Sequence, residues 1–188
     1  MDTIVLLSGG VDSTALIEYH LTRKDNVSTL FIDYSQKSVN SEYQAAEAIS
    51  GHYNVPFFKQ NMESLVNERG EYKCRNAKFI LTACGYLRKT SGLISLGIHT
   101  GSIYYDTTKE FVEDIQKLLD GYYGGTVKLV TPFLNYTKKQ VYQYALKTNL
   151  PLHLTFSCEN SDSKPCGTCG SCIDRSMLND LILNKKNK

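Results

Sequence analysis

The sequence predicts an α/β protein with a doubly wound, mostly parallel sheet of five strands, of the Rossmann-like type. Five short apolar runs alternate with five longer amphipathic runs, which favours βαβ units with right-handed crossovers. Two glycines lie between the first apolar run and the first helix-like run, where such sheets bind ligands. Past Pro151 the alternation stops, and a segment rich in Cys, Ser and Gly follows.

The expected elements follow in chain order. Strands are predicted over residues 3–7, 28–33, 55–59, 93–98 and 128–131. Helices are predicted over residues 13–23, 41–53, 76–89, 109–119 and 138–148, with a short closing helix over 173–183. We expect an α/β domain over residues 1–150 and a cysteine-rich segment with its closing helix over 151–188, which together form one compact unit.

The composition excludes several classes of partner. The 188 residues carry a formal net charge of +2, so there is no strong electrostatic case for binding nucleic acid or a membrane surface. No apolar run approaches the roughly 18 residues that a membrane span needs. Met1-Asp2 leads directly into a predicted core strand, which argues against a signal sequence. We therefore expect a cytoplasmic protein.

The turn Ser8-Gly9-Gly10-Val11-Asp12-Ser13 joins the first strand to the first helix. Such a turn presents free backbone N–H groups and the positive end of a helix dipole to one point, which suits a phosphate. The Ser8 and Ser13 hydroxyls add donors, and Asp12 adds a carboxylate able to hold a phosphate-bound Mg²⁺. The turn is neither G-x-x-x-x-G-K-[ST] nor G-x-G-x-x-G. It predicts a site for a phosphate, with an ordinary glycine turn as the alternative.

Four of the six cysteines lie together in the C-terminal segment: Cys158, Cys166, Cys169 and Cys172. Two C-x-x-C units share Cys169, and this spacing presents thiolates to one metal ion. We expect one structural Zn²⁺ per chain, held by all four sulfurs and closed to catalysis. An iron–sulfur cluster and a redox C-x-x-C pair are the alternatives. Cys74 and Cys84, in predicted helical context, are expected to be buried small side chains.

The glycine turn and the cysteine cluster together resemble the 7-cyano-7-deazaguanine synthases, a family of the PP-loop ATP pyrophosphatases (adenine-nucleotide alpha hydrolases). The turn matches their S-G-G-x-D-S loop, and the cysteines match C-G-x-C-x-x-C. Further family-like segments follow in order: Asp33-Tyr34-Ser35-Gln36 (D-Y-G-Q, with Ser35 for glycine), Glu42 with Ala45-Ala46, Cys74-Arg75-Asn76, Gly97-Ile98-His99, residues 104–111, Thr131-Pro132, Thr137-Lys138, Thr155-Phe156-Ser157-Cys158 and Arg175. The resemblance runs over most of the chain and implies the PP-loop form of the predicted fold.

The resemblance implies an ATP-dependent ligase of queuosine biosynthesis. The carboxylate of 7-carboxy-7-deazaguanine would attack the α-phosphorus of ATP, with Mg²⁺, to give an acyl-adenylate. Ammonia would then displace AMP to give the amide, and a second activation would permit dehydration to the nitrile. The partners implied are the deazaguanine substrate, ATP and ammonia, and the family's members often pair as homodimers.

The resemblance also assigns residues to roles. ATP binding falls to Leu7, Ser8, Gly9, Gly10, Val11, Asp12, Ser13, Asp33, Tyr34, Gln36 and Gly97. Catalytic roles fall to Asp12, Ser13, Arg75 and Lys138, and substrate binding falls to Arg75, Asn76, His99, Asp106 and Glu110. Lys138 would offset phosphate charge, and Arg75 would pair with a carboxylate or phosphate. The ordinary alternatives are solvated side chains for Lys138 and Arg75, a helix cap for Asp106, first-turn charge for Glu110 and a polar strand end for His99.

Departures from the family pattern lie on the substrate side. The loop between Gly97 and Tyr104 is shorter than usual, Thr100-Gly101-Ser102 replace an expected acidic residue, and Thr107-Thr108 replace a Cys-Arg pair. These changes leave a second hypothesis open, a defence-associated relative that uses the same adenylation to attach a deazaguanine to an amine on a protein or nucleic acid. A non-catalytic nucleotide-binding partner protein is the third hypothesis.

Overall fold

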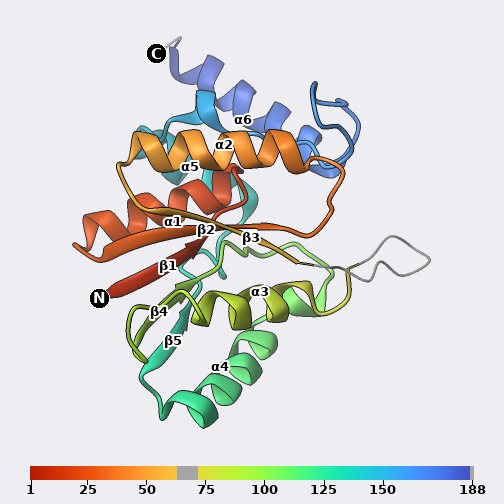
Figure 1. Cartoon of the computed structure of the whole chain (residues 1–188). Helices are drawn as coiled ribbons and strands as arrows, with labels where there is room; N and C mark the ends of the chain where they lie inside the picture. The colour runs from red at the N-terminus through yellow and green to blue at the C-terminus, as the bar shows by residue number, and fades with distance from the viewer. Residues whose placement is uncertain (63–71, 187–188) are drawn as a thin grey trace.

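The five strands form one parallel sheet, as predicted. The computed structural model describes residues 1–62 and 72–186. The strands are β1 (Asp2–Leu6), β2 (Asn26–Asp33), β3 (Phe57–Asn61), β4 (Gly92–Ser95) and β5 (Val127–Val130). Their order is β3-β2-β1-β4-β5, and each neighbouring pair in the described residues is parallel (Figure 1). The strand order reverses between β1 and β4, which is where doubly wound sheets open for a ligand.

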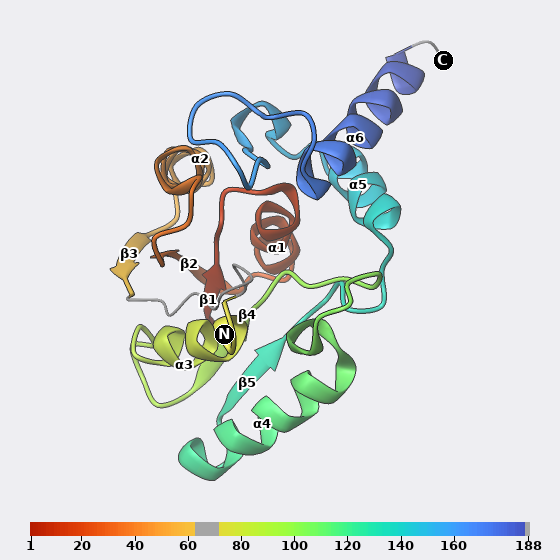
Figure 2. The ribbon, with the colours of Figure 1, turned by 90° about the vertical axis from the view of Figure 1, so that its right-hand side faces the viewer.

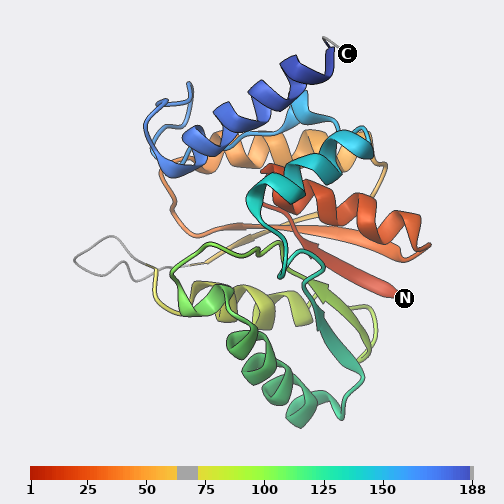
Figure 3. The ribbon, with the colours of Figure 1, turned by 180° about the vertical axis from the view of Figure 1, so that it is seen from behind.

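Helices cover both faces of the sheet (Figures 1 and 3). One layer contains α1 (Val11–Thr22), α2 (Val39–His52) and α5 (Lys138–Lys147), with α6 (Gly170–Lys186) packed against α5. The other layer contains α3 (Arg75–Cys84) and α4 (Lys109–Tyr123). Two short 3₁₀ turns, Tyr105–Thr107 and Leu152–Leu154, precede α4 and the cysteine segment. The doubly wound α/β prediction is confirmed.

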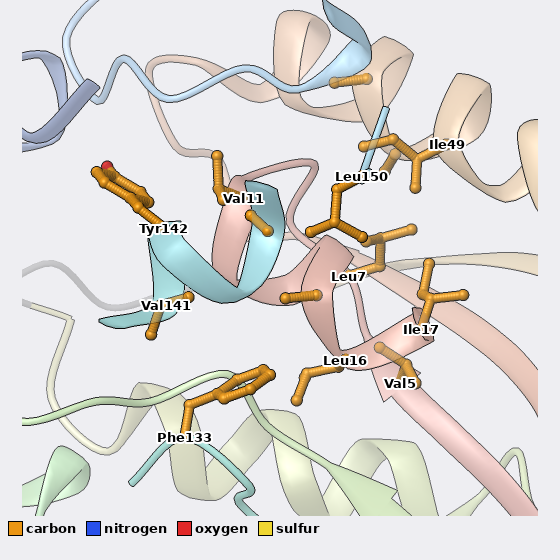
Figure 4. Packing of buried hydrophobic residues seen from close by; sticks show 14 of the residues in the cluster. Val5, Leu7, Val11, Leu16, Ile17, Ile49, Phe133, Val141, Tyr142 and Leu150 are labelled. Atoms are coloured by element: carbon orange, nitrogen blue, oxygen red, sulfur yellow. The ribbon is translucent and has the colours of Figure 1, made fainter. Parts of the chain in front are cut away.

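Alternation along β1 explains how one strand supports both layers. Val5 and Leu7 lie in the cluster under α1, α2 and α5, whereas Ile4 and Leu6 lie in the cluster under α3 and α4. Figure 4 shows the first cluster, in which Leu16 of α1 lies near Phe133. These three β1 side chains and Leu7, which directly follows the strand, are all buried, so the turn after β1 starts from a fixed position.

Element ends differ from the predicted ones for local reasons. Strand β3 begins at Phe57 instead of residue 55, because Pro56 has no N–H and the Val55 N–H donates to the Ser50 carbonyl at 3.1 Å. Strand β4 ends at Ser95 instead of residue 98, since the Ile98 N–H turns to the Leu96 carbonyl at 3.2 Å. Helix α3 ends at Cys84 instead of residue 89, at Gly85, a poor helix former.

The closing helix and one cysteine also depart from prediction. Helix α6 begins at Gly170 instead of residue 173, so Cys172 lies in its first turn. The prediction that Cys74 is buried in a helix is wrong: the residue is exposed, with φ of 58°, and directly precedes α3. Cys84 is buried, as predicted. In the part of the chain that the structure describes, no helix combines the length and the apolar character needed to cross a bilayer.

Candidate functional site

A cavity of about 600 Å³ opens at the carboxyl ends of β1, β2 and β4. Its walls come from the turn after β1, the first turns of α1 and α3, the loop after β4, the start of α5 and the cysteine segment. Parallel strands end at a common edge, so segments far apart in sequence meet here. The volume is within the range of small-molecule sites.

The turn after β1 forms one end of the cavity. Helix α1 makes its first intrahelical bond from the Thr14 N–H to the Gly10 carbonyl, at 3.0 Å, so the N–H groups of the first turn are not used by the helix. The Ser13 hydroxyl holds the turn closed, because it donates to the Gly10 carbonyl at 3.1 Å and accepts from the Ser8 N–H at 3.2 Å. Ser8, Gly10, Val11 and Ser13 all line the cavity. The turn therefore has the geometry of an anion site.

Gly9 packs against α2, whereas its neighbours Ser8 and Gly10 line the cavity. Its φ is 80°, and a Cβ at this position would lie 2.7 Å from the Glu42 carbonyl oxygen and 2.9 Å from the Ala45 Cβ. Gly9 does not line the cavity. Glycine is needed here because the turn packs directly on the backbone of α2.

Asp12 and Lys138 meet inside the cavity. The Lys138 Nζ lies 2.5 Å from Asp12 Oδ2 and 5.4 Å from the centre of the Tyr142 ring. Asp12 Oδ1 is buried and has no hydrogen-bond partner among the described residues. A buried carboxylate oxygen without a partner is costly, so this atom suits a ligand that brings a cation or a donor, such as Mg²⁺-ATP. Lys138 is fixed by its place in the first turn of α5, between the two residues of the capping box, Thr137 and Gln140.

Arg75 and Tyr34 also line the cavity. The Arg75 guanidinium lies 5.9 Å from the centre of the Tyr34 ring. Ser35 has φ of 64°, so this turn adopts the left-handed conformation at a residue other than glycine. The Gln36 side chain is held by Glu42, to which its amide donates at 2.8 Å.

Glu42 is a cavity residue that the sequence analysis did not assign to the site. Its carboxylate accepts from Gln36 Nε2 and, at 2.7 Å, from the Ser38 hydroxyl. Burial raises the pKa of the Glu42 carboxyl. Its position in the E-x-x-A-A segment, directly after the Tyr34 turn, was the available signal.

The structure brings most of the predicted site residues to the cavity. These are Leu7, Ser8, Gly10, Val11, Asp12, Ser13, Tyr34, Gln36, Arg75, Asn76, Gly97, His99 and Lys138. Four others are outside its lining: Gly9, Asp33, Asp106 and Glu110. Their roles in binding ATP or substrate stay predictions, and their positions outside the cavity lining do not support these roles.

Each polar residue outside the lining has another environment. Asp33 pairs with Lys59 Nζ at 3.1 Å. The Asp106 carboxylate accepts from the Asn76 N–H at 3.3 Å, at the start of α3. It does not cap α4, because Thr108 does so by accepting from the Phe111 N–H at 3.1 Å. Glu110 is exposed in the first turn of α4.

Several cavity residues come from the C-terminal segment, where the sequence analysis expected only metal ligands. They are Phe156, Ser157, Glu159, Gly170, Ser171 and Asp174. The Phe156 N–H donates to the Gly9 carbonyl at 3.0 Å, which ties this segment to the turn after β1. The contact joins residues far apart in sequence, so no local pattern could have predicted it.

The four cysteines of the C-terminal segment form a candidate metal centre. Their sulfurs all lie within 4.8 Å of one another, and Cys166 Sγ is 3.9 Å from Cys172 Sγ. Tetrahedral Zn²⁺ with Zn–S bonds of about 2.3 Å needs S–S separations of about 3.8 Å. The residues therefore fit one tetrahedral ion. A four-iron cluster fits less well, because each cysteine would bind a different iron and the sulfurs would lie further apart.

Donors around the sulfurs favour thiolate. The Cys166 N–H points to Cys158 Sγ at 3.3 Å, and the Cys169 N–H points to Cys166 Sγ at 3.4 Å. The Thr168 hydroxyl, with the neighbouring backbone N–H groups, lowers the pKa of Cys166 to about 5. Burial raises the pKa of Cys172 to about 12, which a bound cation would oppose.

Comparisons with a family model and with curated proteins point to the same family. The family model described as "Queuosine biosynthesis protein QueC" matches residues 2–71 and 71–179. A 7-cyano-7-deazaguanine synthase from Prochlorococcus marinus is 30% identical over 216 residues, covering 98% of this chain and 96% of the relative. Another from Acetivibrio thermocellus is 31% identical over 205 residues, covering 92% of this chain and 90% of the relative.

Solved structures share the fold. The U34-tRNA thiolase NcsA from Methanococcus maripaludis, solved with its [4Fe-4S] cluster, aligns with a TM-score of 0.59. The two proteins are 16% identical in sequence. The alignment covers all of this chain and 67% of the thiolase. This likeness supports the PP-loop type of α/β fold.

Proposed function

The chain belongs to the QueC family of queuosine biosynthesis proteins, and from that premise we propose that it is an ATP-dependent 7-cyano-7-deazaguanine synthase. The observation that carries the proposal is the arrangement of the cavity. The turn after β1 and the Asp12–Lys138 pair lie at one wall, and Arg75 with Asn76 lies at another. A nucleotide phosphate and a substrate carboxylate can thus be held in one space of about 600 Å³.

The residues of the cavity have distinct proposed tasks in adenylation. Free N–H groups at the start of α1 bind the phosphates and stabilise the charge that develops during attack on the α-phosphorus. Lys138 offsets phosphate charge, and Asp12 faces the Mg²⁺ that ATP brings. Arg75 orients the substrate carboxylate by charge-assisted hydrogen bonds. The rings of Tyr34, Phe79 and Phe156 line the cavity and reduce its exposure to water.

The proposed reaction proceeds through two activations. The carboxylate oxygen forms a bond to the α-phosphorus while the bond to pyrophosphate breaks. Ammonia adds to the acyl carbon, AMP leaves with that oxygen, a proton is lost from the nitrogen, and the amide results. The amide oxygen then attacks the α-phosphorus of a second ATP while the bond to pyrophosphate breaks, and loss of AMP and of both protons of the amide nitrogen leaves the nitrile. The chain's contribution is to exchange oxide, a poor leaving group, for AMP.

A second candidate function is an acceptor larger than ammonia. Ile103 is 92% exposed beside Tyr104, which lines the cavity, and Tyr105 is also exposed. Thr108, at a position where the family has arginine, caps α4 and does not line the cavity. These features favour a protein amine that approaches along the exposed apolar run and receives the activated deazaguanine.

Purified protein with Mg²⁺-ATP, 7-carboxy-7-deazaguanine and ammonium tests these functions. We expect AMP, pyrophosphate and the nitrile, followed by mass spectrometry. AMP release with the deazaguanine mass appearing on an added protein, and no nitrile, would favour the second candidate. If ATP is not turned over with either acceptor, both candidate functions are contradicted, and a non-catalytic nucleotide-binding protein remains.

We also propose that the four cysteines hold one structural Zn²⁺. Cys169→Ser is expected to lower the zinc content from about one ion per chain to well below that and to reduce the melting temperature, since binding of a structural ion contributes directly to folding. Metal analysis and calorimetry measure both quantities. Cys74→Ser, at an exposed cysteine outside the cluster, is the matched control and should keep the metal. A Cys169→Ser protein with full zinc content would contradict the assignment.

Location in the cytoplasm and pairing into a homodimer stay predictions.

A further inference from the structure

Asp162 joins the cysteine segment to the first turn of α2. Its Oδ1 accepts from the Ser41 N–H at 2.8 Å, and its Oδ2 accepts from the Asn40 side-chain amide. Its carbonyl oxygen accepts from the Ser41 hydroxyl at 2.7 Å. Figures 1 and 2 show the blue loop that carries Asp162 next to the beginning of α2.

Helix α2 depends on this contact because its own N-cap side chain is used elsewhere. Ser38 occupies the N-cap position but makes no capping bond, and its hydroxyl donates to Glu42 Oε1. The Ser41 N–H, one of the first N–H groups of the helix, is satisfied by Asp162 instead. The Asp162 carboxylate also lies at the positive end of the α2 dipole. Asp162 is thus the cap of a helix that is distant in sequence.

The capped turn of α2 is in contact with the nucleotide end of the cavity. Glu42, the residue after Ser41, lines the cavity with its side chain. Its carbonyl oxygen is the atom that a Cβ on Gly9 would approach to 2.7 Å. A displacement of this turn would therefore move Glu42 and remove the surface on which Gly9 packs.

The position of Asp162 depends in turn on the cysteines. Asp162 lies midway in the loop between Cys158 and Cys166, and the donor set fits one ion bound by both. An ion that binds both ends closes this loop and removes conformations in which Asp162 is far from Ser41. The loop between Cys158 and Cys166 thus connects the candidate metal centre to Asp162, whose hydrogen bonds lead to the first turn of α2 and from there to the turn after β1.

We propose that Asp162 is a positioning residue that couples metal binding at the four cysteines to nucleotide binding in the cavity. The inference rests on the proposed nucleotide site and metal centre. It predicts that zinc raises the affinity for nucleotide, and that nucleotide raises the affinity for zinc by the same factor. A metal centre that only stabilised the C-terminal segment would not change nucleotide affinity.

The test measures both halves of this coupling. Calorimetry gives the Kd of α,β-methylene-ATP, with Mg²⁺, for zinc-loaded and chelator-treated protein, and we expect about fivefold or more weaker binding without zinc. Competition with a chromogenic chelator, with and without saturating analogue, gives the reciprocal change in zinc affinity. Circular dichroism reports whether the metal-free protein keeps its fold. If it does not, the coupling is judged from the competition experiment, which measures whether the analogue changes the affinity for zinc.

Three variants distinguish the effect of losing the Asp162 contacts on the coupling factor from the effect of general destabilisation. Asp162→Ala removes both carboxylate acceptors and should lower the coupling factor to about half or less of the wild-type value. Asp162→Asn should keep most of it, because an amide oxygen can still accept from the Ser41 N–H. Asp180→Ala, at an exposed position in α6, should change nothing.

The outcomes show separately whether the coupling through Asp162 fails and whether the proposed nucleotide site fails. Equal nucleotide affinity with and without zinc, or an unchanged coupling factor in Asp162→Ala, would overturn the coupling while leaving the proposed function intact. Failure of the zinc-loaded wild type to bind the analogue would overturn the proposed nucleotide site and the inference together.

Discussion

Replacing Asp12 by alanine is expected to lower kcat/KM for AMP formation by about 10³-fold while the fold remains intact. Asp12 Oδ1 is a buried acceptor without a partner among the described residues, and Oδ2 is the ion-pair partner of Lys138. Both oxygens lie at the phosphate end of the cavity, so the substitution removes the group that faces Mg²⁺-ATP. Steady-state assays of AMP release give the rate constants, and circular dichroism checks the fold.

Two controls sharpen the Asp12 result. Asp12→Asn keeps the size of the side chain, so a similar loss would show that the charge is needed. Asp180→Ala removes an exposed carboxylate from α6 and should retain full activity. An Asp12→Ala protein within about threefold of wild-type kcat/KM would exclude the role in activation that we give this residue.

Gly9→Ala is expected to weaken ATP binding by about tenfold to a hundredfold. The added Cβ would lie 2.7 Å from the Glu42 carbonyl oxygen, and backbone atoms cannot move aside without shifting the turn. Overpacking of this kind typically costs about 1–3 kcal/mol, apart from the cost of a positive φ. The Kd of α,β-methylene-ATP and the free energy of unfolding measure the two effects.

Gly125→Ala is the matched control for the steric part of this prediction. Gly125 has φ of 79°, nearly that of Gly9, but its added Cβ would meet no atom closer than 3.7 Å. Both variants should lose stability from backbone strain, and only Gly9→Ala should lose nucleotide affinity. Equal affinity in the two variants would contradict the account of the turn packed on α2.

The fold was predictable because its signals are local. Short apolar runs that alternate with longer amphipathic runs indicated the strands and helices in their order. Ends were less predictable, because they depend on single hydrogen bonds such as that from the Val55 N–H to the Ser50 carbonyl. The left-handed conformation of Cys74 has no local sequence signal, since cysteine shows no preference for it.

From residue spacing alone, the candidate site was predictable only where one segment carries it, and the family resemblance supplied the predicted residues of the other segments. The turn after β1 and the four cysteines each lie in a short stretch, so their residues could be named from spacing alone. Asp106 was expected in the cavity, yet it supports the start of α3, because its place depends on how two loops pack. Glu159 and Asp174 reach the cavity through tertiary contacts that no spacing encodes.

The fate of the carboxylate oxygen tests most directly whether this chain activates a carboxylate by adenylation. Incubation of the enzyme with Mg²⁺-ATP, ammonium and 7-carboxy-7-deazaguanine labelled with ¹⁸O in its carboxylate allows the label to be followed by mass spectrometry. The account predicts one ¹⁸O in each AMP released and unlabelled pyrophosphate. Unlabelled AMP, or ¹⁸O in phosphate released with ADP, would contradict attack by the carboxylate on the α-phosphorus.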